Sequence, residues 1–314
     1  MSEQEQVEEK QLSIFITGAG QGVGLAAATE ANRRGYKVVG TTSLGTVGAY
    51  RIRRAGGLPI YPDLTRESAV YSALQMAKAD VIINATPQIV NGIPHNIVDY
   101  DKLLPYLEAS THALMGAAGR ADISRIIHIS AASIYGDTHH EAVKEDAHLL
   151  LNNPLANSLH EAEETIFDGG IPGYVLRTGY IYGTHAACSD VAQAMREGKA
   201  MPRGSNATSW THEDDVASAA LLIAEKDSDD STHDVYNIAS QTSITPDEFI
   251  NQFGETYGIG EPMSLSGFML QFRTSEIQRN LINMGTLLDT TKAREELGWS
   301  PKGTIAGGLD KMLL

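Results

Sequence analysis

The sequence contains a single cysteine, Cys188, among its 314 residues. One thiol cannot form an internal disulfide, and it cannot build a zinc site made of cysteines. The first residues also lack the basic and apolar stretches of a secretory signal peptide. These absences predict a protein of the reducing cytoplasm.

Long hydrophobic runs and positive charge are scarce as well. No apolar run approaches the ~20 residues that a membrane-spanning helix needs, so we expect no membrane partner. The 24 Lys and Arg residues stand against 39 Asp and Glu residues, and the formal net charge of -15 opposes attraction to phosphate backbones. We therefore expect a small-molecule substrate and no nucleic acid partner, and the sequence leaves a homodimer open.

The order of apolar and amphipathic stretches indicates the fold. Residues 1–11 are acidic and carry almost nothing to bury, so we expect a disordered tail. Short apolar runs then alternate with longer amphipathic stretches, which predicts an α/β fold with a doubly wound parallel sheet. The predicted strands are 12–17, 36–41, 58–61, 80–85, 125–130 and 174–178, and the predicted helices are 22–34, 66–77, 96–115 and 158–167.

A glycine-rich loop follows the first predicted strand and leads directly into a helix. Only glycine lets a backbone turn this tightly and approach a pyrophosphate closely, and the helix N-terminus offers free N–H groups to the anion. The loop therefore predicts a dinucleotide site at Gly18, Gln21, Gly22, Val23 and Gly24. The alternative is a glycine-rich turn that binds nothing.

This loop, Thr17-Gly18-x-x-x-Gly22-x-Gly24, resembles the TGxxxGxG loop of short-chain dehydrogenases/reductases. Further stretches resemble, in order and spacing, the extended branch of that superfamily, which includes nucleotide-sugar epimerases and dehydratases. They are HISAASIYGD (128–137), RTGYIYG (177–183), HEDDVASA (212–219), YNIAS (236–240) and LDTTKAREELGWSP (288–301). The resemblance implies NAD or NADP bound on a Rossmann domain.

The resemblance also implies further cofactor contacts. Asp63 and Leu64, after the third predicted strand, look like the acidic pair that contacts adenine in this superfamily. Asn84, Ala85 and Thr86 end the fourth predicted strand, where the backbone usually passes the nicotinamide side.

Two lobes fit the length of the chain. We expect the NAD(P)-binding Rossmann domain to comprise residues 12–183 and about 213–240. A smaller substrate lobe would comprise about 184–212 and 241–314. In the latter segment, Thr245 to Glu248 read as a capping box that opens a helix.

The end of the second predicted strand bears on the choice of nucleotide. NAD-preferring members carry an acid there that binds the ribose hydroxyls, whereas this chain has Thr42 and Ser43. With no carboxylate to repel a 2′-phosphate, and with Arg51, Arg53 and Arg54 a short way on, NADP is slightly favoured over NAD. The alternative places these arginines on a solvated helix face.

The residues that do acid–base chemistry in similar enzymes are missing. Extended-branch members resemble one another in a Ser/Thr, Tyr and Lys set, in which the tyrosine moves a proton. The Ser/Thr position is Ala131 here, and the family's spacing places the other two at Ala156 and His160, or at Leu155 and Leu159. Moreover, no lysine in the chain follows a tyrosine by four positions.

Substitutes for this set are few. His160 or Tyr135 could carry the proton, although an exposed helical histidine and a packing tyrosine are the plain alternatives. Tyr182, His185 and Trp210 fall where similar enzymes contact substrate, with structural packing as the alternative.

These observations leave two hypotheses for function. One is an oxidoreductase or epimerase-like enzyme that acts on a small molecule with a non-standard proton donor. The other is a noncatalytic dinucleotide-binding sensor, regulator or assembly subunit. We expect no metal, because His139, His140 and His148 lack the spacing of metal ligands.

Overall fold

The computed structural model describes residues 11–86, 92–95, 98–184, 186–226, 233–265 and 267–311. Apart from Gln11, the tail expected at 1–11 lies outside the described residues. Within the described ranges, no helix is both long enough and apolar enough to cross a bilayer.

A seven-stranded parallel sheet forms the centre of the molecule, with strand order β10-β7-β5-β4-β1-β2-β3. Its inner strands are buried from end to end, as their nearly continuous apolar sequences predict. The doubly wound α/β fold and all six predicted strands are confirmed. The strands are β1 (Ser13–Thr17), β2 (Lys37–Thr41), β3 (Leu58–Ile60), β4 (Val81–Asn84), β5 (Arg125–Ala131), β7 (Gly173–Thr178) and β10 (Asp234–Ile238).

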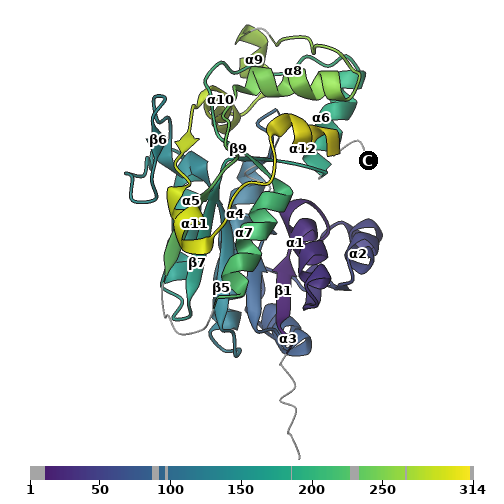
Figure 1. Cartoon of the computed structure of the whole chain (residues 1–314), viewed down its shortest axis with the longest axis vertical. Helices are drawn as coiled ribbons and strands as arrows, with labels where there is room; N and C mark the ends of the chain where they lie inside the picture. Colours follow the sequence, from purple (N-terminus) through teal and green to yellow (C-terminus); the bar gives the residue numbers. More distant parts are fainter. Residues whose placement is uncertain are drawn as a thin grey trace, which may run out of the picture.

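Helices cover both faces of this sheet (Figure 1). Successive side chains of a strand point to opposite faces, so Ile14 and Ile16 pack toward α1 and α7 while Phe15 packs toward α3 and α4. The helix expected over 96–115 is α4. These helices are α1 (Gly22–Arg33), α2 (Gly45–Arg54), α3 (Glu67–Ala77), α4 (Tyr100–Ala118), α5 (Pro154–Phe167) and α7 (Glu213–Ala224).

The helices differ from the prediction in several places, since α4 covers Tyr100–Ala118 instead of 96–115 and α7 was not predicted. Helix α5 begins four residues earlier than expected, because the Asn153 side chain caps it by accepting from Ala156 N at 3.0 Å and Pro154 fits the first helical position. Helix α2, which carries the arginines, was not predicted as an element.

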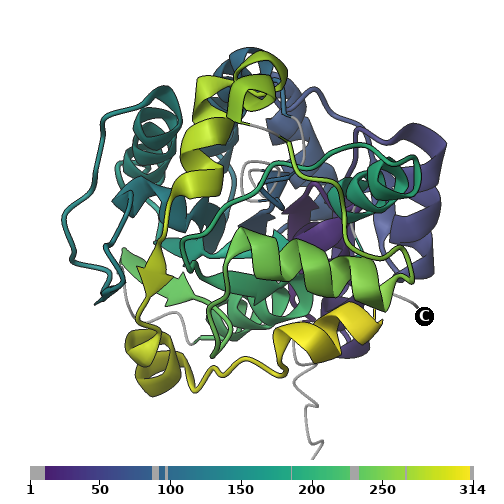
Figure 2. The ribbon, with the colours of Figure 1, turned by 90° about the horizontal axis from the view of Figure 1, so that it is seen from above.

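The second lobe lies at the carboxyl end of the sheet, and in Figure 2 its helices surround the ends of the central strands. The predicted capping box is confirmed, because Glu248 N donates to Thr245 Oγ1 at 3.0 Å and Thr245 N donates to Glu248 Oε2 at 2.8 Å. The domain limits stay a prediction. The elements here are β8 (Tyr180–Tyr182), α6 (Ala186–Arg196), β9 (Trp210–His212), α8 (Pro246–Thr256), α9 (Gly267–Arg273), α10 (Glu276–Asn283) and α12 (Ile305–Lys311).

Three short elements lie near β10, the edge strand of the large sheet. Strand β6 (Ala142–Val143) pairs with β11 (Leu287–Leu288), and helix α11 (Thr291–Leu297) packs beside β10 and α7. A 3₁₀ turn, Ala132–Tyr135, directly follows β5.

Candidate functional site

Hydroxyl groups fix the glycine loop at the carboxyl end of β1. Thr17 Oγ1 donates to Asn84 Oδ1 at 2.6 Å and accepts from Thr86 N at 3.1 Å. Gly18 N donates to Thr41 Oγ1 at 3.2 Å. The ends of three adjacent strands, β1, β2 and β4, are thereby held together around the loop.

The loop itself requires glycine. Gly18 and Gly22 have φ values of 65° and 55°, which side chains rarely tolerate. A Cβ on Gly24 would lie 2.4 Å from the carbonyl oxygen of Gly18. Because α1 begins at Gly22, its first-turn N–H groups follow the loop directly, and this arrangement suits a pyrophosphate.

A cavity of about 390 Å³ opens beside this loop. Six of the predicted cofactor residues line it: Gly18, Gln21, Thr42, Ser43, Leu64 and Thr86. The sequence analysis missed the aromatic and apolar side chains that complete the walls, namely Leu44, Tyr61, Leu103 and Tyr106. Leu103 and Tyr106 come from α4. The local sequence does not show which turn of this helix lies next to the end of β4, so these two residues could not be predicted.

The other predicted cofactor residues lie around the cavity without lining it. Val23 and Ala85 are buried in the core, and Asn84 is buried beside the loop. Asp63 is exposed, and its carboxylate accepts from the amide and the hydroxyl of Thr65, which lowers the pKa of Asp63. The assignment of these residues to a cofactor stays a prediction.

The arginines of α2 divide into two groups. Arg51 Nη1 donates to Gly20 O at 3.5 Å, so its guanidinium lies beside the glycine loop. Arg53 and Arg54 are exposed, and the Arg54 guanidinium lies 5.9 Å from the centre of the Tyr50 ring. Of the three, Arg51 is the one whose guanidinium contacts the glycine loop.

The positions at which the resemblance leads us to expect the acid–base set carry mostly apolar side chains. Ala131 at the end of β5, and Leu155 and Leu159 on α5, are buried in one hydrophobic cluster. In the alternative spacing Ala156 is also buried, and His160 is partly exposed. Of these four positions on α5, His160 alone carries a side chain that can hold a proton.

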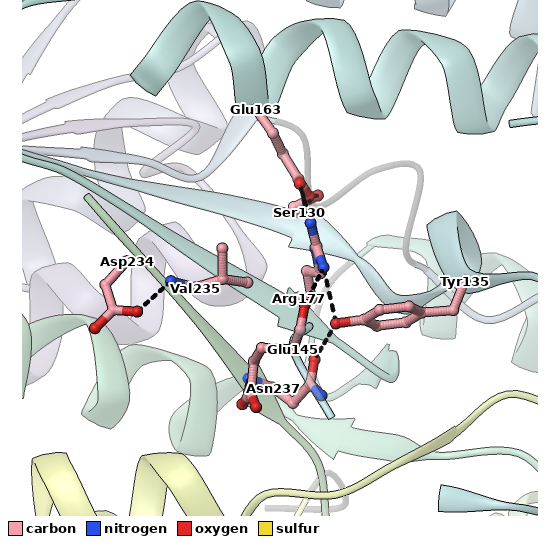
Figure 3. Close-up of polar contacts among 8 residues, drawn as sticks. All are labelled: Ser130, Tyr135, Glu145, Glu163, Arg177, Asp234, Val235 and Asn237. Atoms are coloured by element: carbon pink, nitrogen blue, oxygen red, sulfur yellow. Dashed lines mark hydrogen bonds and ion pairs between the residues drawn. The ribbon is translucent and has the colours of Figure 1, made fainter. Parts of the chain in front are cut away.

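Tyr135 has two hydrogen-bond partners in a buried polar network (Figure 3). Its hydroxyl donates to Asn237 Oδ1 at 2.9 Å and accepts from Arg177 Nη1 at 2.9 Å. Burial raises the pKa of Tyr135 to about 12. Its role as a proton donor stays a prediction, and this geometry counts against it.

The centre of that network is an ion pair. Arg177 Nη2 lies 2.6 Å from Glu163 Oε2, and the two side chains are 6% and 1% exposed. Ser130 Oγ donates to Glu163 Oε1 at 2.5 Å, and Arg177 Nη1 also donates to Glu145 O at 3.1 Å. The pair joins β5, β7 and α5 below the site.

The predicted substrate residues are placed in the packing of the second lobe. Trp210 is fully buried, stacks on Phe249 with ring centres 3.8 Å apart, and donates to Ile244 O at 3.0 Å. Tyr182 is buried against Phe249 and His212. His185 lies outside the described residues, and the substrate role of all three stays a prediction.

A small hollow lies beside the turn after β5. Its walls include Ser133, Thr178, Tyr180, Thr208 and Thr286, and none of its lining residues is charged. The Ser133 hydroxyl is buried and has no hydrogen-bond partner among the described residues. Ser133 was not predicted as a site residue, although it lies two positions before Tyr135 in the stretch that carries the resemblance.

Residues 14–239 match the NAD dependent epimerase/dehydratase family. The match covers well over half of the chain, and the chain belongs to this family. It is therefore an enzyme of an NAD-dependent family in the extended short-chain dehydrogenase/reductase superfamily, as the resemblance implied.

Two curated relatives share about a quarter of their residues with this chain. A low-salt glycan biosynthesis protein of Haloferax volcanii is 26% identical over 75% of this chain and 74% of its own length. A dTDP-glucose 4,6-dehydratase of Streptomyces antibioticus is 22% identical over 96% of this chain and 91% of its own. The solved UDP-glucose 4-epimerase of Bifidobacterium longum, in complex with NAD+ and UDP, has a TM-score of 0.78 at 17% identity, with 96% of each chain covered. This last likeness concerns the fold alone.

Proposed function

We propose that this enzyme binds NADP or NAD in the cavity beside the glycine loop and acts on a small sugar-nucleotide-type molecule with a non-standard proton donor. The observation that carries the proposal is the convergence of six predicted cofactor residues on one cavity of about 390 Å³. The dinucleotide would supply hydride transfer, and the chain would supply binding and orientation.

The residues of the cavity suit each part of a dinucleotide. The tight loop at Gly18 and the start of α1 suit the pyrophosphate. Tyr61 and Tyr106 offer flat apolar surfaces to the adenine. Thr42 and Ser43, without a carboxylate, suit the adenosine ribose or its 2′-phosphate.

NADP is slightly favoured because of charge. Arg51 lies beside the glycine loop, and the neutral side chains at the end of β2 do not repel a phosphate. Arg51 is the arginine of α2 that supports this preference, since Arg53 and Arg54 are exposed and only Arg51 contacts the loop among the described residues.

The substrate class is drawn from the relatives. One acts on dTDP-glucose, and another was solved with UDP. The proton donor is the unusual part. The family's spacing puts Ala131 at the Ser/Thr position, and it puts Ala156 and His160, or Leu155 and Leu159, at the other two. His160 remains the first candidate.

Nicotinamide fluorescence titration tests the cofactor proposal. We expect saturable binding of NADPH and NADH, with NADPH at least a few-fold tighter. The variant Ser43→Glu adds a carboxylate at an exposed wall position, and should weaken NADPH binding about tenfold or more by charge repulsion while NADH binding changes little.

The matched control is Ser68→Glu, which adds the same charge at an exposed position of α3 and should leave both affinities unchanged. Absence of binding to either nucleotide would overturn the proposal. Equal effects of Ser43→Glu on both nucleotides would overturn the preference for NADP.

A further inference from the structure

Three polar side chains form a row across the central sheet, beside the glycine loop. In the parallel register Thr17 of β1 is paired with Asn84 of β4, and Asn84 is paired with His128 of β5. Such pairs point to the same face of a sheet. Two residues back along each strand, the row on this face is apolar and consists of Phe15, Ile82 and Ile126. His128 therefore stands in a core position next to apolar neighbours.

The hydrogen bonds along the polar row have one direction. Thr86 N donates to Thr17 Oγ1 at 3.1 Å, and Thr17 Oγ1 lies 2.6 Å from Asn84 Oδ1. This second separation suits an O–H···O bond and is short for N–H···O, so the oxygen of the Asn84 amide faces Thr17. The amide nitrogen then faces His128, and it lies 3.1 Å from His128 Nδ1. An amide NH₂ group can only donate, so Nδ1 is the acceptor.

This direction decides which ring nitrogen of His128 carries the proton. Burial lowers the pKa of His128 to about 4, so the ring is neutral at physiological pH and has one N–H. Because Nδ1 accepts from Asn84, that N–H is at Nε2. Nε2 is buried, and it has no hydrogen-bond partner among the described residues. An unmatched buried N–H is unfavourable, and a phenylalanine would avoid it, so the reason for a histidine here lies in Nδ1.

The effect of Nδ1 is to fix the orientation of the Asn84 amide. With the amide turned over, its nitrogen would face Thr17, whose hydroxyl proton would then lose its acceptor. Thr17 directly precedes Gly18, and its hydroxyl also binds Thr86 N. Gly18 and Thr86 both line the cofactor cavity. The orientation of one buried amide is thereby linked to two backbone positions of the cofactor cavity.

We infer that His128 is a positioning residue for the dinucleotide: its Nδ1 fixes the Asn84 amide, which through the Thr17 hydroxyl holds the start of the glycine loop in the conformation that binds the pyrophosphate. The inference rests on the proposed function, since it concerns the same cavity. His128 is fully buried, so it acts through its two neighbours in the row and takes no part in the reaction.

Two substitutions separate this role from packing. His128→Phe fills the same space but leaves the Asn84 amide without its acceptor, and should weaken NADPH binding about fivefold or more. It also removes the unmatched N–H, so the free energy of unfolding should change little. His128→Asn offers an oxygen at the position of Nδ1, and should keep NADPH affinity within about threefold of the wild type. Its smaller side chain leaves space unfilled, so here the free energy of unfolding should fall.

Nicotinamide fluorescence titration measures the affinities, and urea denaturation measures the stabilities. His148→Asn, at an exposed position, is the control and should change neither. If His128 only packed, the loss of affinity would follow the loss of stability, and His128→Asn would bind NADPH more weakly than His128→Phe. That order would overturn the inference, and so would unchanged NADPH affinity in His128→Phe.

NMR of the histidine ring nitrogens tests the same idea in the wild-type chain, without regard to how the variants fold. The ring signals that are missing from His128→Phe belong to His128. We expect its proton on Nε2 and none on Nδ1. A proton on Nδ1 would overturn the inference and leave the cofactor proposal standing, whereas absence of NADPH binding by the wild type would overturn the proposed function itself.

Discussion

At the scale of single residues, the buried pair of Arg177 and Glu163 shows that the neighbours of a side chain in sequence do not reveal its partner in the fold. Each residue stands in a recognisable stretch, but the pair forms because β7 and α5 meet in space. The same holds for Tyr135, which the sequence analysis considered for proton transfer. Its hydrogen bonds to Arg177 and Asn237 come from segments far along the chain, so its neighbours in sequence do not show them.

The pair leads to a stability prediction. Glu163→Gln leaves the Arg177 charge buried without its counter-ion, so the free energy of unfolding should fall by about 3 kcal/mol or more. Combining it with Arg177→Met removes both charges, and the double variant should lose much less than the sum of the two single losses. Urea denaturation measures all three, and losses that simply add would show that the two side chains do not act as a pair.

At the scale of elements, local chemistry accounts for most of the predicted structure. The nearly continuous apolar runs identified the strands because both faces of the sheet are covered. The capping box at Thr245 identified the start of α8. Helix α5 began earlier than expected because its cap, Asn153 followed by Pro154, was overlooked, although that signal is visible in the sequence.

The capping box can be tested directly. Thr245→Ala removes the side-chain oxygen that accepts from Glu248 N, and should lower the free energy of unfolding by about 1 kcal/mol. Thr242→Ala, at an exposed position just before the helix, is the control and should have an effect near zero. Urea denaturation compares the two, and equal losses would mean that the cap contributes nothing specific.

At the scale of the whole molecule, the site is assembled from long-range contacts. The sequence could predict the glycine loop and the ends of β2 and β4, because parallel strands bring their carboxyl ends to one edge. It could not predict Tyr106, since this residue reaches the cavity only through the crossing of α4. Ala131, Leu155 and Leu159 are buried in one hydrophobic cluster, and we propose that the chain departs there from the family's usual chemistry.

The most direct test of that departure is the turnover of the cofactor-loaded enzyme with UDP-glucose, measured as epimerisation. General acid–base catalysis typically contributes ~10²–10⁴-fold, and we propose that this chain lacks the residues that usually supply it. We therefore predict a turnover number lower by about that factor than the ~10 s⁻¹ of a typical enzyme, even with NADP(H) or NAD(H) bound. Turnover near ~10 s⁻¹ would contradict the account, because it would mean that an effective proton donor is already in place.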